Sequence, residues 1–164
     1  SGKNAMVLEI SSTPYIFTFK LWDWGRLGLD GKPRPINIQH GSRVINYSRD
    51  TKWVQENLID QFEPLEKTDA YTAEKTGLHI FEPIETVRHW FTGEVCHKAN
   101  GSVCVLNLVE GEEAEVVSPC GAFVPYVVHY AETFIVPAEV GDFILRPTEK
   151  TKGKKLATIK AYIR

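Results

Sequence analysis

The sequence of 164 residues has no apolar run near the roughly 18 residues that span a bilayer, and no apolar core of a secretory signal near its start. It also lacks a strong excess of either charge, because 19 Lys and Arg stand against 21 Asp and Glu. A net charge of -2 does not create the basic field that attracts nucleic-acid phosphates. We therefore expect a cytoplasmic protein that binds neither membranes nor nucleic acid.

Cysteine is also scarce, since Cys96, Cys104 and Cys120 are odd in number and show no CxxC spacing. This argues against a disulfide framework and a cysteine zinc site, so we expect reduced thiols packed in strands. The histidines show no HxH or HxxxH spacing. They are His40, His79, His89, His97 and His129. His129 with Glu132 is the least improbable metal-binding pair, but we expect no metal in this chain.

The first third of the sequence mixes strand and helix signals. Residues 6–10 and 15–24 are rich in β-branched and aromatic side chains with partial alternation, which predicts two early strands. Two short helices are predicted over 37–47 and 52–62, where apolar residues fall near helical spacing. The Asp-Thr pair at 50–51 is suited to cap the second helix.

Strand signals dominate the second half of the sequence. Residues 63–78 show no period and are predicted to form an irregular surface excursion. Short apolar runs then alternate with Gly-containing turns, and these runs predict strands over 87–96, 102–110, 114–118, 122–129, 133–137, 143–146 and 156–163. Pro125 indicates an edge strand or a bulge, because proline cannot donate to a ladder. The fold class is therefore mainly β, and a double-sheet jelly roll fits best.

Two parts of the sequence resemble a known enzyme family. Residues 133–138 (TFIVPA), followed by 141–143 (GDF), resemble a strand-and-turn phrase common to many cupins. The N-terminal part is similar to bacterial type I phosphomannose isomerases in three segments: VLE at 7–9, YIFTFKLWDWGRL at 15–27 and DGKPR at 30–34. We therefore expect a cupin-type jelly-roll barrel or sandwich, with one or two short helices after the first strands.

The resemblance implies one cupin-like domain over residues 1–164. In that reading, residues 1–35 are strands and a loop from the end of the catalytic half, and 36–78 form a helical or irregular connection. Residues 79–164 are the C-terminal cupin half. The resemblance covers residues 6–40 through specific motifs and roughly 93–163 at the level of the C-terminal cupin half, and residues 52–92 are placed by continuity only.

The family interconverts mannose 6-phosphate and fructose 6-phosphate with one divalent metal, usually zinc. Its ligands are Gln, His, Glu and a last His shortly before the VLE segment. The segment begins here at Val7, so the resemblance implies that all four ligands precede this chain. We expect the zinc in a missing N-terminal segment of the parent enzyme, no metal or cofactor in this chain, and no activity of the chain alone.

Aldose-ketose isomerisation needs a base, an electrophile and a cation for the phosphate. The family arginine that stabilises charge on the substrate corresponds to Lys20, which offers a point charge in place of a planar fork. Arg26 matches a second family arginine, and Asp23 matches an aspartate with a structural hydrogen-bonding role. The resemblance thus assigns Lys20 as catalytic, and Lys20 and Arg26 as sugar-phosphate ligands. The alternatives are an ordinary outward-facing Lys20 and a structural ion pair at Arg26.

Six aromatic residues invite the hypothesis of a sugar platform, although a core or an interface is the commoner role for such rings. They are Phe17, Phe19, Trp22, Trp24, Trp90 and Phe91. The alternative function is a non-catalytic cupin module that binds a sugar or a protein partner. Apolar strand faces left uncovered by a missing N-terminal half would favour a homodimer.

Overall fold

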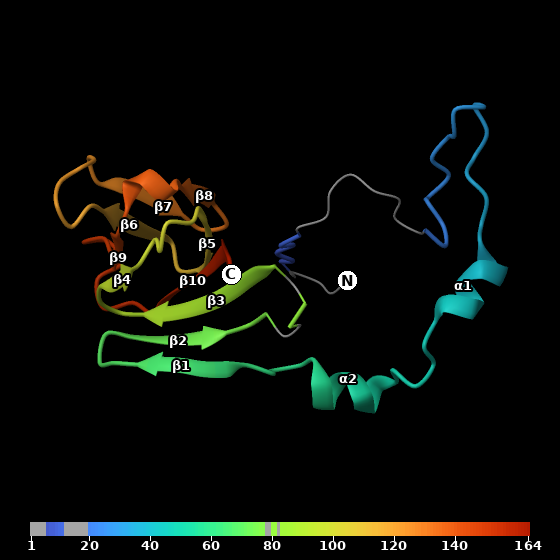
Figure 1. Cartoon of the computed structure of the whole chain (residues 1–164), viewed down its shortest axis with the longest axis horizontal. Helices are drawn as coiled ribbons and strands as arrows, with labels where there is room; N and C mark the ends of the chain where they lie inside the picture. The colour runs from blue at the N-terminus through green and yellow to red at the C-terminus, as the bar shows by residue number, and fades with distance from the viewer. Residues whose placement is uncertain (1–5, 12–19, 78–79, 82) are drawn as a thin grey trace. The chain divides into compact units, whose positions relative to one another are not determined.

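The computed structural model describes residues 6–11, 20–77, 80–81 and 83–164. The chain divides into two compact units. The first consists of Ser1–Ser12 with Gln61–Arg164, and the second of Thr13–Asp60. The strands belong to the first unit and both α-helices to the second (Figure 1). The division into residues 1–35, 36–78 and 79–164 stays a prediction.

The second unit contains the two predicted helices. Helix α1 spans Ile38–Val44 and α2 spans Thr51–Asn57. The side chain of Asp50 accepts a hydrogen bond of 2.8 Å from the main-chain N–H of Trp53, which makes it the N-cap of α2. The two helices and the cap confirm the expectation from sequence. None of the described helices is long and apolar enough to cross a bilayer.

The two early strands were predicted wrongly wherever the structure describes them. Residues 6–10 and 20–24 form no strand, and 15–19 lie outside the described residues. At 20–24 the backbone turns, because Trp24 has φ of 51° and the N–H of Arg26 bonds to the carbonyl of Asp23. For both segments, strand propensity without a partner ladder does not make a strand.

Trp22 and Trp24 do not enter a core within their unit. Their rings lie 4.3 Å apart between centroids, but the residues are 49% and 82% exposed. Among the other aromatic residues of that set, Phe91 is a core residue and Trp90 is half-buried. A sugar platform at the tryptophan pair stays a prediction.

The first unit is a double-sheet antiparallel structure. One sheet has the strand order β1-β2-β3-β10-β5-β8 and the other has the order β4-β9-β6-β7. The strands of the first sheet are, in that order, Glu63–Lys67, Tyr71–Lys75, Ile84–Phe91, Leu156–Ile163, Cys104–Glu110 and Thr133–Val136. Those of the second are Val95–His97, Phe143–Pro147, Glu113–Val117 and Tyr126–His129, and a 3-10 turn spans Ala138–Val140. This mainly β, jelly-roll architecture confirms the predicted fold class.

Residues 63–78 are not the irregular excursion that the sequence predicted, because β1 and β2 form a hairpin there. All five residues of β1 are exposed, so this edge strand carries no apolar alternation that a sequence reading could detect. The hydroxyl of Thr68 accepts hydrogen bonds from the N–H groups of Ala70 and Tyr71 and thereby closes the turn.

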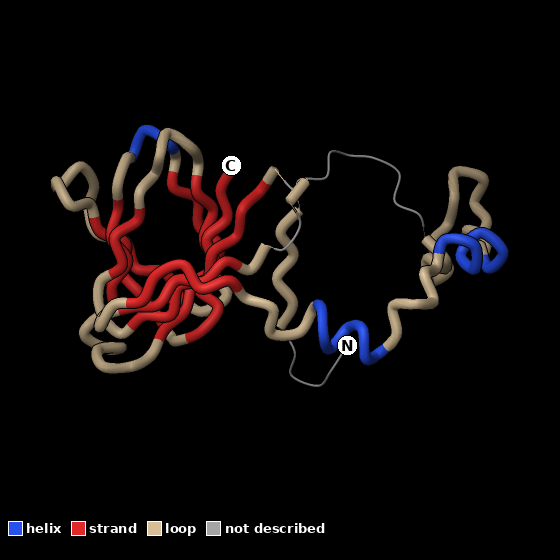
Figure 2. Tube along the Cα trace, turned by 60° about the horizontal axis from the view of Figure 1, so that its bottom comes forward, coloured by secondary structure: helices blue, strands red, loops and turns tan. Residues whose placement is uncertain are grey.

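The core lies between the two sheets, where alternate residues of each strand point inward. In β3, for example, Val87 and Phe91 are buried while their neighbours are only half-buried. The buried apolar cluster comprises Phe91, Val95, Cys104, Leu106, Leu108, Ala114, Val116, Val128, Val136, Phe143, Leu145 and Leu156. Figure 2 shows the strands of this unit joined by loops and turns.

In this unit the prediction for the cysteines is only partly right, whereas the prediction for Pro125 is confirmed. All three cysteines are free, and Cys104 is buried in β5, but Cys96 and Cys120 are exposed and so not packed inside. Cys96 is exposed because it takes the outward position of β4. Pro125 directly precedes β7, the edge strand of its sheet, as predicted.

We predict that Leu108→Ala lowers the free energy of unfolding by about 2 to 5 kcal/mol, because Leu108 is fully buried and its loss leaves a cavity. The matched control is Ile135→Ala on the outer strand β8, where the side chain is 66% exposed. Its cost should stay within about 1 kcal/mol. Denaturant unfolding of both variants measures the difference, and equal costs would contradict this assignment of the core.

Candidate functional site

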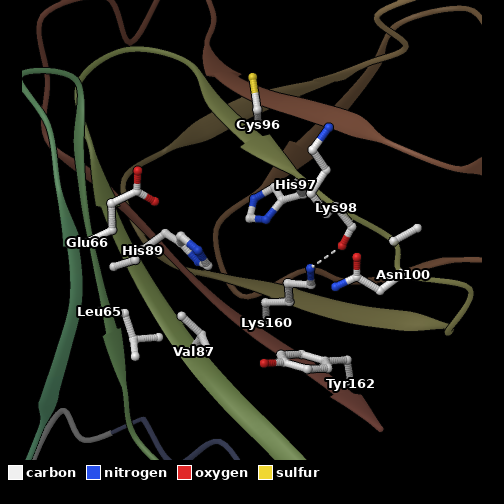
Figure 3. A pocket seen from close by; sticks show the side chains of 12 residues that line it. Leu65, Glu66, Val87, His89, Cys96, His97, Lys98, Asn100, Lys160 and Tyr162 are labelled. Carbon is white, nitrogen blue, oxygen red and sulfur yellow. Dashed lines mark hydrogen bonds between the residues drawn. The ribbon is translucent and has the colours of Figure 1, made fainter. Parts of the chain in front are cut away.

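A cavity of about 330 Å³ in the β unit is lined by several polar side chains. His89 of β3, His97 of β4 and Lys160 of β10 converge there from three elements (Figure 3). The lining is completed by Leu65, Glu66, Ala73, Val87, Cys96, Lys98, Ala99, Asn100 and Tyr162. The pocket thus joins cationic and imidazole groups to a partly apolar wall.

Strand parity places these side chains inside the sheet sandwich. His89 shares the inward face of β3 with Val87 and Phe91, and His97 shares that of β4 with Val95. Lys160 pairs in register with Val87 of β3. Buried polar residues thus share the inner faces of β3, β4 and β10 with apolar core residues.

Lys160 is only 8% exposed, although it is a lysine. Its Nζ donates a hydrogen bond of 3.0 Å to the main-chain carbonyl of Lys98, and it lies 5.9 Å from the ring centre of Phe143. No carboxylate among the described residues lies within ion-pairing distance of this ammonium group. Its direct contacts are a neutral carbonyl and aromatic rings, and the carboxylate of Asp142, which pairs with Lys98, interacts with it only at longer range.

The two histidines form an aromatic cluster with Phe143 beside Lys160. The His89 and His97 rings meet edge to face with centroids 4.7 Å apart, and His97 stacks on Phe143 at 4.8 Å. Burial, helped by the nearby charge of Lys160, lowers the pKa of His89 from its ordinary 6.5 to about 4. Burial, with His89 and Lys160 nearby, holds the pKa of His97 well below its usual range. Both rings are neutral at physiological pH.

Each of these rings keeps one nitrogen without a hydrogen-bond partner. The atoms are Nδ1 of His89 and Nε2 of His97, and both are buried. Buried polar atoms are usually satisfied, so such exceptions call for an explanation.

The donor set of this pocket does not suit a divalent metal. Within the described residues, no three His, Cys, Asp or Glu side chains come together as metal ligands. The Lys160 ammonium would also repel a cation held by the two histidines. The pair His129 and Glu132 is exposed, and Nδ1 of His129 lies 3.1 Å from a Glu132 carboxylate oxygen. The prediction that this chain holds no metal nevertheless stays a prediction.

The residues assigned by resemblance lie in the other unit. Lys20 is half exposed, and its Nζ is 3.9 Å from a carboxylate oxygen of Asp23. The other Asp23 oxygen accepts a hydrogen bond of 3.0 Å from Arg34, so this aspartate organises the loop. Arg26 is exposed and makes no ion pair with the described residues. The structure brings Lys20 and Asp23 together, while the roles of Lys20 and Arg26 stay predictions.

Sequence reasoning missed the pocket. It considered His89 and His97 only as possible metal ligands and did not consider Lys160. The available signal was the alternation of inward and outward positions. His89 lies two residues from Val87 and Phe91, and His97 lies two residues from Val95, so each histidine shares a face with apolar residues. Lys160 lies within a predicted strand that is otherwise largely apolar. A lysine within an otherwise apolar central strand is the feature that could have drawn attention.

We predict that acid weakens the fold through the histidine pair before most carboxylates titrate. The unfolded chain takes up protons at these rings near pH 6.5, whereas folded His89 does so only near pH 4. Its contribution to stability is therefore complete above pH 6.5 and is lost as the pH falls toward 4. The loss should reach about 1.4 kcal/mol per pH unit for each histidine.

Unfolding free energies measured in denaturant across this pH range test the expectation. His89→Gln should flatten the slope, and His40→Gln, which changes an exposed histidine of α1, serves as the control. A wild-type slope that is unaffected by His89→Gln would show that other groups cause the acid sensitivity.

Three solved structures illustrate what the chain is similar to. The mannose 6-phosphate isomerase from Bacillus subtilis matches over 86% of this chain and 38% of its own, at 16% identity and a TM-score of 0.57. The Fe(II) form of HppE matches over 65% of this chain and 59% of its own, at 10% identity and a TM-score of 0.52. An RmlC-like cupin from Shewanella frigidimarina matches over 64% and 86%, at 21% identity and a TM-score of 0.47.

No protein-family model matches the chain, and no curated protein does. At these identities the likeness shows the fold alone. This chain spans 38% of the isomerase chain that it matches. Together with the two antiparallel sheets, the comparisons show a jelly roll of the cupin type, which confirms that part of the resemblance.

Proposed function

We propose that this chain is the C-terminal cupin portion of a mannose-6-phosphate isomerase and that it is inactive on its own. The observation that carries the proposal is the structural likeness to the Bacillus subtilis enzyme over 86% of this chain. The motif likeness of residues 6–40 supports it independently, because it concerns particular residues and not the fold.

The loop over residues 20–34 has the charge that such a role requires. It holds four basic residues against two acidic ones. Arg34 makes the short contact to Asp23, whereas the Lys20 ion pair of 3.9 Å is long and solvent-exposed. Exposed pairs of this kind are weak, so Lys20 can exchange Asp23 for a substrate oxyanion. Arg26, with no ion pair among the described residues, is equally available.

In this proposal Lys20 and Arg26 orient the sugar phosphate by holding its negative charge. They do not supply the base or the electrophile of the proton transfer between C1 and C2. Those groups, and the zinc that the family implies, belong to the N-terminal part of the parent enzyme, since the described residues of this chain do not fit a zinc site.

A non-catalytic cupin module that binds a small ligand is the second candidate. The observation that favours it is the pocket of His89, His97 and Lys160, whose polar groups all come from this chain. Catalysis by the parent protein separates the two candidates.

We predict that the complete parent protein converts mannose 6-phosphate to fructose 6-phosphate, loses that activity when chelated and recovers it with zinc. The present chain alone should show no turnover under the same conditions. A coupled assay for fructose 6-phosphate measures both. A complete protein that stays inactive with zinc would leave the binding module as the better account.

We predict that Lys20→Met or Arg26→Met in the parent protein lowers kcat/KM by about tenfold or more, mainly by raising KM. A charge-assisted hydrogen bond to an oxyanion contributes about 1.5 to 3 kcal/mol, which sets this scale. Lys52→Met is the matched control, because Lys52 is 80% exposed in α2 and pairs only loosely with Glu56. If both loop variants behave like the control, the two residues do not hold the substrate.

A further inference from the structure

The β unit contains two buried charged side chains among its described residues, and only one of them is neutralised. Glu85 is 7% exposed and lies 3.0 Å from both Lys75 and Arg164. Lys160 is 8% exposed and makes no ion pair within the described part of the chain, since the Asp142 carboxylate that interacts with it at longer range is paired with Lys98. A buried charge without a partner is costly, so folding leaves Lys160 in need of an anion.

The hydrogen-bonding capacity around Lys160 is also unfilled. An ammonium group has three donors, and the Lys98 carbonyl accepts from one of them. The Nδ1 of His89 and the Nε2 of His97 have no partner. These two nitrogens are sealed from the cavity, but both rings line it, and a neutral imidazole can carry its N–H at either nitrogen. Each ring can therefore offer its other nitrogen as a donor to an acceptor in the cavity.

The rest of the pocket defines the size and chemistry of its occupant. A volume of about 330 Å³ is at the small end of ligand sites. The Asn100 amide lines the same cavity as Lys160, and Leu65 and Tyr162 offer apolar surface to a carbon skeleton. Lys98 adds a second cation at the rim, although Asp142 pairs with it at 2.5 Å.

The Glu66 side chain is the acidic group that lines the pocket, and it accepts a hydrogen bond of 2.7 Å from Tyr71. It forms no ion pair with Lys160, so the ammonium group remains a local positive centre, although Glu66 balances its charge within the same cavity. A positive centre beside neutral rings favours an anion and disfavours a metal cation.

We propose that this pocket binds a small molecule through an oxyanion group, a phosphate or a carboxylate, held by Lys160 with His89 and His97 as further donors. The site goes beyond the isomerase proposal, because it uses neither Lys20 nor Arg26. It is a binding site within the present chain, and it requires no covalent step.

The test uses the present chain with inorganic phosphate and, separately, acetate as probes at about pH 7. Histidine ring signals in NMR spectra should shift for His89 and His97 with at least one probe, while those of His40 and His129 stay in place. The probe that shifts them identifies phosphate or carboxylate as the preferred group. If neither probe moves the two ring signals at up to tens of millimolar, the proposal is wrong.

Lys160→Met should weaken the binding of the effective probe at least tenfold, whereas Lys152→Met should change it less than twofold. Lys152 is a fair control because it is 76% exposed in the β9–β10 turn. Unweakened binding by a folded Lys160→Met protein would overturn the proposal. Stoichiometric zinc binding that shifts both rings in the wild-type chain would do so too, and this wild-type measurement decides the matter if Lys160→Met does not fold.

Discussion

The pairing of β10 with both β3 and β5 is the constraint on which the β unit depends. This strand lies at the centre of the larger sheet, and its register sets Thr158 opposite His89 and Lys160 opposite Val87. A slip of one residue would turn Lys160 outward and place Ile159 inside. The same strand pairing therefore places Leu156 in the core and Lys160 in the pocket.

The jelly roll could be predicted from sequence because its core strands have clear strand patterns. Strands such as β5 and β10 are apolar, short and bounded by Gly-containing turns, and Asp50 shows its capping role through residue type alone. The β1–β2 hairpin could not be predicted, since an edge strand exposed along its whole length has no period. At residues 20–24 the error was the reverse: the aromatic residues predicted a strand, but the backbone turns there.

The candidate site was less accessible to sequence reasoning than the fold. The assignments of Lys20 and Arg26 came from motif likeness, and neither residue is positioned by burial. The pocket residues come from strands separated by many positions, so their convergence depends on sheet topology and not on spacing. His89 and Lys160, for example, meet only because β3 and β10 are neighbours.

The stacking of His97 between Phe143 and His89 has a consequence for recognition. A ring held on both sides has already lost its rotational freedom when the protein folds, so a ligand does not have to immobilise it. The direction in which its free nitrogen points is fixed as well. Selectivity in such a cavity is governed by its shape and by the positions of its polar atoms, more than by rearrangement of the side chains around each ligand.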